Sequence, residues 1–142
     1  MYQDSYREDN VYSKYRNLNL NFCLIAGLGE LELIPAWINK TYPECSVDII
    51  EKDESKKSSL SNNVIYTDIF TFEPKQKYDL IVMDIWYAGT PGYRTEIEVL
   101  KSKYFYYLNK QGIMSFPMID MHTIYSYVEL QRRINWLNRA NA

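Results

Sequence analysis

FCLIAGLGELELIPAW, residues 22–37, is the stretch of sequence that decides the fold. Residues 22–26 are apolar without interruption, and the run stops abruptly at Gly27-Leu28-Gly29. A short apolar run of this kind is typical of a strand that is covered on both faces of a sheet. We therefore predict a buried strand, a glycine turn, and a helix from Glu30 to about Thr41, with the turn bordering a ligand.

The residues of the glycine turn restrict the kind of ligand. Gly27 and Gly29 permit positive φ angles and a close approach of the backbone to a bound molecule. In a dinucleotide-binding turn a third glycine would stand at position 32, which is Glu32 here. Glu30 and Glu32 suit the positive end of a helix but would repel a phosphate. A dinucleotide is therefore disfavoured, and a ligand that presents a positive charge at this point is favoured.

The rest of the chain alternates strand and helix patterns. Strands are predicted at residues 46–51, 64–67, 78–84 and 113–116, and helices at residues 94–109 and 122–138. The polar run at 52–63 is too short and too polar for a full crossover helix. This alternation predicts an α/β fold, a Rossmann-like three-layer sandwich around a mostly parallel sheet of about five strands in the order 3-2-1-4-5. Ligands then bind beyond the carboxyl ends of the strands, beside the switch point between strands 1 and 4.

Composition excludes several other classes of protein. The chain has 142 residues, a net charge of −2 and 46% hydrophobic residues, which favours one soluble domain and predicts no bulk nucleic-acid binding. No apolar run approaches the length of a membrane span, the polar N-terminus does not fit a secretory signal, and a cytoplasmic location is expected. Cys23 and Cys45 are expected to be reduced thiols. No His, Cys or carboxylate cluster has metal-ligand spacing, so no metal is predicted, and the lone His122 is expected to be a cap or surface residue.

Three carboxylates follow predicted strands and should meet at one edge of the sheet. Glu51 stands where an acid accepts both hydroxyls of an adenosine ribose, and an exposed charge at a strand end is the alternative. Asp68 could receive the amine of an adenine while Ile69 or Phe70 packs on the base, or it could simply start a turn. Asp84 could hold an amine or accept a proton.

Two aromatic residues and one further carboxylate are read from the same strand. Trp86 and Tyr87 follow Asp84 and could line the site of a planar or cationic substrate, or they could be core aromatics. Asp79 opens the strand at the opposite end, so it is interpreted as structural.

Together these segments resemble the class I S-adenosylmethionine-dependent methyltransferases, and among them the spermidine synthase-like branch. The likeness spans about residues 20–117 and rests on the motifs Leu24-Ile-Ala-Gly-Leu-Gly29, Ile49-Ile-Glu-Lys-Asp53, Tyr66-Thr-Asp-Ile69, Tyr78-Asp-Leu-Ile-Val-Met-Asp84 and Tyr107-Leu-Asn-Lys-Gln-Gly-Ile113.

The resemblance implies a role for each predicted site residue. Gly27 and Gly29 would approach the methionine part of S-adenosylmethionine, or of its decarboxylated form. Glu51 would bind the ribose, Asp68 and Ile69 the adenine, and Asp84 would face the transferred group or an acceptor amine.

The chain is expected to form a single domain, residues 1–142. It comprises an N-terminal arm or helix at 1–17, a cofactor-binding core at 20–117 and a C-terminal helix at 120–139. The tyrosines of the arm, Tyr2, Tyr6, Tyr12 and Tyr15, are expected to pack it onto the body, and a lid over a ligand is the alternative.

Two functions are open from the sequence. The first is a small transferase that moves a methyl or aminopropyl group to a small-molecule or amine acceptor. The second is a reduced member of the fold that binds or assembles without catalysis, because no two further strands are expected after the fifth. In that case a second copy could cover a free edge at strand 5 or the C-terminal helix.

Overall fold

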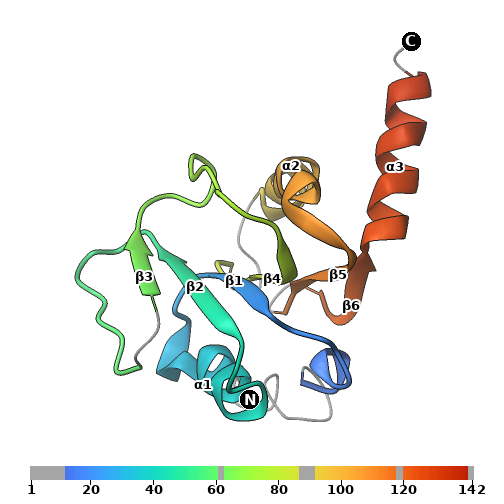
Figure 1. The fold of residues 1–142 in the computed structure, drawn as a ribbon. Helices are drawn as coiled ribbons and strands as arrows, with labels where there is room; N and C mark the ends of the chain where they lie inside the picture. The colour runs from blue at the N-terminus through green and yellow to red at the C-terminus, as the bar shows by residue number, and fades with distance from the viewer. Residues whose placement is uncertain (1–11, 61–62, 87–91, 118–119, 141–142) are drawn as a thin grey trace.

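The computed structural model describes residues 12–60, 63–86, 92–117 and 120–140, and its centre is one six-stranded sheet. The strands are β1 (Phe22–Ala26), β2 (Ser46–Glu51), β3 (Asn63–Tyr66), β4 (Tyr78–Met83), β5 (Leu108–Phe116) and β6 (Asp120–Ser126). Their order is β3-β2-β1-β4-β5-β6, and every neighbouring pair is parallel except β5 and β6 (Figure 1). The predicted α/β class and the order of the first five strands are therefore confirmed.

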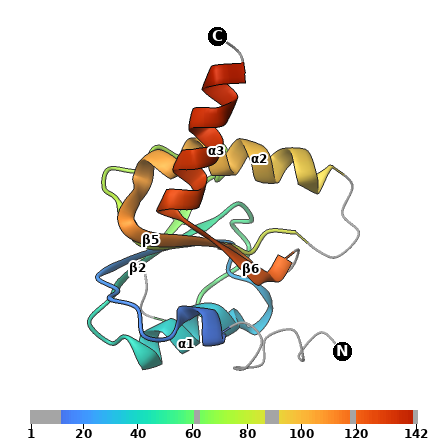
Figure 2. The ribbon, with the colours of Figure 1, turned by 90° about the vertical axis from the view of Figure 1, so that its right-hand side faces the viewer.

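Helices cover both faces of this sheet, so the molecule has three layers (Figure 2). On one side lie α1 (Leu33–Thr41) and the short helix η2 (Tyr12–Tyr15), and on the other lie α2 (Tyr93–Tyr104) and α3 (Tyr127–Ala140). Two further short helices, η3 (Glu30–Glu32) and η4 (Phe105–Tyr107), precede α1 and follow α2. The C-terminal half of α3 extends away from the body (Figure 1).

Alternate residues of each central strand enter opposite cores. In β1, Leu24 and Ala26 pack with the α2 and α3 side, whereas Cys23 and Ile25 pack with the α1 side. All four side chains have no exposed area. Burial on both faces explains why the strand reads as an uninterrupted apolar run.

The two cysteines are free, as predicted. Burial, followed by the nearby Asp79 carboxylate, raises the pKa of Cys45 to about 11. Burial raises the pKa of Cys23 as well. Both groups therefore stay thiols at neutral pH, so neither is a ready nucleophile.

Two predicted helices have wrong boundaries. The helix expected at 94–109 ends at Tyr104, and Leu108 already pairs with Tyr78 of β4. The expected strand at 113–116 therefore begins five residues earlier, with a register shift between Tyr78 and Leu80. Helical spacing of apolar side chains suggested a longer helix, but hydrogen bonding to β4 decides the conformation of this segment.

The C-terminal helix expected at 122–138 was also wrong at its start. Residues 120–126 form β6, which pairs with β5, and α3 begins only at Tyr127. His122 thus lies in a strand instead of capping a helix, and the edge that we expected to be free at the fifth strand is covered by β6. Thr123-Ile124-Tyr125, a run of β-branched and aromatic residues, was the available signal for a strand.

The N-terminal arm packs on the body through Tyr12 and Tyr15, as expected, while Tyr2 and Tyr6 lie outside the described residues. The Tyr12 ring stacks on Trp37 of α1 at 4.8 Å between centroids. Tyr15 is fully buried, and its hydroxyl forms a 2.7 Å hydrogen bond with the Ser115 hydroxyl of β5. The arm thereby reaches a strand 100 residues away in the sequence.

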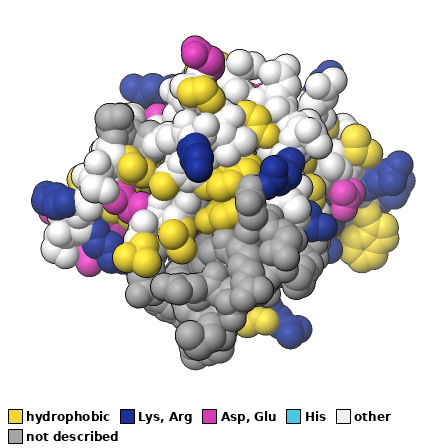
Figure 3. Space-filling view, turned by 90° about the horizontal axis from the view of Figure 1, so that it is seen from below, with side chains coloured by type: hydrophobic (Ala, Val, Ile, Leu, Met, Phe, Trp, Pro, Cys, Tyr) yellow, Lys and Arg dark blue, Asp and Glu magenta, His cyan; other side chains and the backbone are white. Residues whose placement is uncertain are grey.

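One face of the molecule carries both hydrophobic and charged side chains. Seen from below, hydrophobic side chains form a band across the middle of one face, and the Lys and Arg side chains there are scattered (Figure 3). Within the part of the chain that the structure describes, no helix has the length and apolarity needed to cross a bilayer.

Candidate functional site

The candidate site lies at the carboxyl ends of β1, β2 and β4, where the strand order reverses. From β1 the chain proceeds to β2 and β3 on one side and then returns to β4 on the other. In folds of this kind, ligands bind beyond the carboxyl ends of the strands beside such a reversal of the strand order.

The glycine turn after β1 is packed against the loop after β4. Gly27 has φ +92° and Gly29 has φ +69°, so both adopt the predicted positive values. A Cβ atom at Gly27 would lie 2.3 Å from the backbone oxygen of Asp84, and the Gly27 N–H donates to the Ile50 carbonyl at 2.7 Å. Only glycine fits at position 27, because backbone occupies the space of a side chain.

Glu51 ends β2 directly beside this turn. The residue is 6% exposed, and its two carboxylate oxygens accept backbone hydrogen bonds from Leu28 at 3.0 Å and from Asp53 at 2.9 Å. A carboxylate has about four acceptor sites, so each oxygen can still receive another donor. Glu51 is therefore a buried acceptor held in place at the switch point, and the alternative of an exposed strand-end charge is wrong.

Asp84 follows β4 and lies against the other glycine. A Cβ atom at Gly29 would lie 2.6 Å from the Oδ2 atom of Asp84. The Asp84 N–H donates to the Ala26 carbonyl at 2.8 Å, which continues the pairing of β4 with β1. Gly29 thus leaves space for the carboxylate of Asp84 over the turn.

Trp86 turns inward instead of lining this edge. It is 4% exposed, its indole N–H donates to Glu96 at 2.9 Å, and its ring lies 5.9 Å from that of Phe116. This matches the alternative interpretation of a core aromatic. Tyr87 lies outside the described residues.

Asp68 and Ile69 follow β3, which lies two strands away from β1 and its glycine turn. The Oδ1 atom of Asp68 accepts the Phe70 N–H at 2.9 Å, which is the turn-starting geometry, and Oδ2 lies 3.8 Å from the Lys52 ammonium. Ile69 is 5% exposed, and its carbonyl accepts a 2.6 Å hydrogen bond from the Tyr104 hydroxyl. The turn-starting role is observed. The Oδ2 atom faces Lys52, the residue that follows β2.

Glu32 was expected to lie beside a ligand, but its side chain binds Ser58 and Ser59 instead. Its carboxylate accepts hydrogen bonds from the Ser58 hydroxyl and from the N–H and hydroxyl of Ser59, at 3.0 and 2.8 Å for Ser59. Burial opposes ionisation, but these hydrogen bonds outweigh it and lower the pKa of Glu32. No sequence pattern predicts this tether, which attaches the polar run after β2 to the start of α1.

Asp79 lies at the opposite end of the sheet, as predicted. Its Oδ2 accepts the backbone N–H groups of Asn21 and Phe22 at 2.8 and 3.0 Å, and its Oδ1 accepts from the Asn109 amide at 2.7 Å. These contacts hold the starts of three strands together, so the role of Asp79 is structural.

Known structures allow this geometry to be compared. The chain is similar to the plantazolicin methyltransferase BpumL, solved with SAH and a pentazolic desmethylPZN analog, with 20% identity over 80% of this chain and 44% of that one and a TM-score of 0.58. It is similar to coclaurine N-methyltransferase bound to N-methylheliamine and SAH, with 21% identity over 72% and 32% of the two chains and a TM-score of 0.55. It is also similar to an S-adenosylmethionine-dependent methyltransferase from Clostridium acetobutylicum ATCC 824, with 19% identity over 80% and 49% and a TM-score of 0.55.

This chain has the methyltransferase fold. The part that matches spans less than half of each of these three proteins. No protein-family model matches the sequence, and no curated protein matches it. These three structures are methyltransferases, so membership of the spermidine synthase-like branch stays a prediction.

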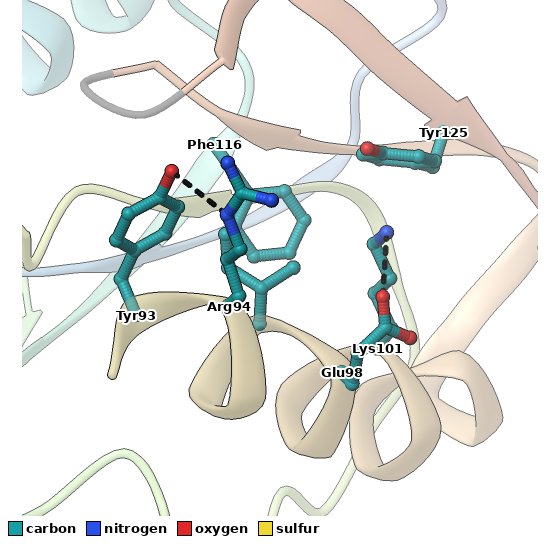
Figure 4. A pocket seen from close by; sticks show the side chains of 7 residues that line it. Tyr93, Arg94, Glu98, Lys101, Phe116 and Tyr125 are labelled. Atoms are coloured by element: carbon teal, nitrogen blue, oxygen red, sulfur yellow. Dashed lines mark hydrogen bonds and ion pairs between the residues drawn. The ribbon is translucent and has the colours of Figure 1, made fainter. Parts of the chain in front are cut away.

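A pocket that the sequence did not predict lies on the α2 side of the methyltransferase fold. Its volume is about 390 Å³, and it is lined by Tyr93, Arg94, Ile97, Glu98, Lys101, Phe116 and Tyr125 (Figure 4). Among the predicted site residues that the structure describes, none lines it. The spacing of Arg94, Glu98 and Lys101, by four and then three residues, was a signal that these side chains share one helix face.

Among the residues that the structure describes, no group of three or more His, Cys, Asp or Glu side chains could hold a metal ion. The candidate site consists of the glycine turn after β1 and the carboxylates of Glu51 and Asp84.

Proposed function

We propose that this chain binds S-adenosylmethionine beside the Gly27–Gly29 turn and transfers its methyl group to an acceptor. The observation that supports this most directly is Glu51, a buried carboxylate at the end of β2 whose oxygens are positioned by Leu28 and Asp53. Similar structures of the same fold contain SAH, the product of methyl transfer from this cofactor.

The residues at the strand ends fit the chemical groups of such a cofactor. The acceptor sites left on Glu51 suit the two hydroxyls of a ribose. Asp68 Oδ2 suits an exocyclic amine, and the nearby Ile69 suits the face of a base. Gly27 and Gly29 have positive φ and no side chains, so the methionine part can approach the backbone at these two positions.

When bound, the cofactor supplies a methyl carbon attached to a positively charged sulfur, and a lone pair of the acceptor attacks it in line as the carbon–sulfur bond breaks. The protein mainly fixes the two reactants in this alignment. The Asp84 carboxylate, held over Gly29, would orient the acceptor and receive its proton if one is released.

The test is calorimetric titration of the protein with S-adenosylhomocysteine. Wild type should bind, and Glu51→Gln, which keeps the shape of the side chain, should weaken binding about tenfold or more because hydrogen bonds to a charged acceptor are the stronger ones. Glu54→Gln, on an exposed side chain three residues away, is the matched control and should bind like wild type. A wild-type protein that gives no binding heat would overturn the proposal.

Aminopropyl transfer from the decarboxylated cofactor is the other reaction to compare. Titration with both cofactors separates methyl transfer from aminopropyl transfer. Tighter binding of S-adenosylmethionine would favour methyl transfer, and tighter binding of the decarboxylated form would favour aminopropyl transfer. The notion of a binding module without catalysis is supported by one observation: Trp86, expected to meet a substrate, is instead buried and hydrogen-bonded to Glu96. Binding of S-adenosylhomocysteine without methyl transfer to any acceptor of a chemical panel would favour it.

A further inference from the structure

We propose that the pocket between α2, β5 and β6 binds a planar, negatively charged group, such as an aromatic carboxylate, and that this group belongs to the methyl acceptor. Only the word acceptor rests on the function proposed above. The position, the charges and the shape of the pocket support the binding of such a group.

The position of the pocket relates it to Asp84. Val82 of β4 pairs with Ser115 of β5, so Phe116 is level with Met83, one residue before Asp84. Neighbouring strands lie about 4.8 Å apart. Phe116 lines the pocket, and its ring contacts Trp86, two residues beyond Asp84. The pocket thus lies one strand away from Asp84, at the same edge of the sheet.

The charges in and around the pocket are mostly positive. The Lys101 ammonium lies 3.6 Å from Glu98, and Glu98 also receives Arg133 of α3 at 2.8 Å. Arg94 contacts Tyr93, with its Nε donating to the phenol oxygen at 3.3 Å. Among the described residues that line the pocket, two are cations and one is an acid, and this acid is already shared with Arg133.

Lys101 gives the strongest indication that the pocket is built for an anion. Only 7% of this residue is exposed, and its ammonium lies 3.8 Å from the centre of the Tyr125 ring. Burying a cation costs free energy that one partly exposed carboxylate does not fully offset, since Glu98 divides its interaction between Lys101 and Arg133. A second anion between Arg94 and Lys101 would complete the charge balance, whereas an ammonium group would be repelled.

The walls of the pocket select a flat group. The Phe116 and Tyr125 rings meet edge to face with centroids 5.9 Å apart, and Ile97 forms part of the floor from α2. In Figure 4 the side chains of Arg94 and Lys101 rise from α2 toward β5 and β6. A volume of about 390 Å³ is at the small end of the range for ligand pockets, roughly 300–1,000 Å³. A ring system with one carboxylate therefore fits both the walls and the charges.

The test is titration of the whole protein with 2-naphthoate and with 2-naphthamide, which has the same shape and no charge. The naphthoate should bind about tenfold more tightly than the amide, and Arg94→Gln should remove most of that difference. Arg132→Gln, which removes the same charge from an exposed position on α3, is the matched control and should leave binding unchanged. Lys101→Met is a second variant and should also abolish the preference for the anion.

Three results would overturn the pocket: no binding of naphthoate, equal binding of the two compounds, or an unchanged preference in Arg94→Gln. Titration of the same samples with S-adenosylhomocysteine separates this inference from the proposed function. Binding of S-adenosylhomocysteine without naphthoate overturns the pocket alone. Binding of naphthoate without S-adenosylhomocysteine overturns the proposed function and the naming of the occupant as a methyl acceptor.

Discussion

Gly27 shows how one residue can fix the geometry of the candidate site. It turns the chain at φ +92°, donates to the end of β2, and leaves no space for a side chain in front of the Asp84 backbone. Gly29 similarly leaves space for the Asp84 carboxylate. The distance between the turn and Asp84 therefore depends on two missing Cβ atoms.

Replacement of Gly27 by alanine should destabilise the fold more than the same change at Gly92. Both positions have positive φ, which costs alanine roughly 1–2 kcal/mol. At Gly92 no atom lies within 4 Å of the added Cβ, whereas at Gly27 it would meet backbone at 2.3 Å, which should raise the total loss to about 3 kcal/mol or more. Urea unfolding of both variants measures this, and equal losses would contradict the account.

At the scale of elements, the segment that follows β2 is irregular over its described residues, 52–60. Residues 52–60 contain no helix, and they are attached to the start of α1 through Ser58, Ser59 and the carboxylate of Glu32. Leu31 and Glu32 adopt positive φ values of 62° and 50° just before α1. The tether is thus made by a residue whose own backbone is strained, at the start of α1.

This tether should make stability depend on pH on the acid side. The pKa of Glu32 lies below its ordinary value of 4.5 in the folded protein, so its stabilising contribution is present above pH 4.5 and is lost as pH falls through the lowered pKa. The free energy of unfolding, measured against pH, should therefore differ between wild type and Glu32→Gln above pH 4.5 and converge at lower pH. Replacing Ser58 and Ser59 by alanine together should reproduce the part of the effect that comes from the two hydroxyls, because the backbone N–H at position 59 remains a donor. A difference between wild type and Glu32→Gln that persists unchanged into acid would refute the prediction.

At the scale of the whole molecule, long-range contacts hold the three layers together. The Tyr15 hydroxyl reaches Ser115 of β5. The hydroxyl of Tyr42, the residue after α1, donates to the Tyr15 carbonyl and accepts the Leu18 N–H. Burial raises the pKa of Tyr15, so its hydroxyl stays neutral and hydrogen-bonded in the core. The short helix η2 is thus an integral part of the α1 layer.

Ser115→Ala should destabilise the protein by about 1–3 kcal/mol, because it leaves the buried Tyr15 hydroxyl without its partner. Adding Tyr15→Phe should recover part of this loss, since the unsatisfied hydroxyl is then removed. A double-mutant cycle on unfolding free energies measures the coupling. Additive losses would mean that the hydrogen bond contributes no coupling to the fold.

Much of the fold was predictable because buried parallel strands have a strong local signature. The strands at 22–26 and 46–51 have the predicted bounds, and the positive φ values of Gly27 and Gly29 follow from the residue type. Residues 120–126 were misassigned because a strand at the sheet edge depends on pairing with β5, which a local pattern does not contain.

The sequence by itself determined the α/β class, the order of the first five strands in the sheet, and the convergence of Glu51 and Asp84 on one edge. These follow from apolar runs and from the fixed handedness of crossover connections. Only the tertiary structure decided which polar groups meet: Glu32 with Ser58 and Ser59, Trp86 with Glu96, and Lys101 with Tyr125. Such pairs join residues up to 27 positions apart, and their meeting depends on side-chain directions that the packing of whole elements sets.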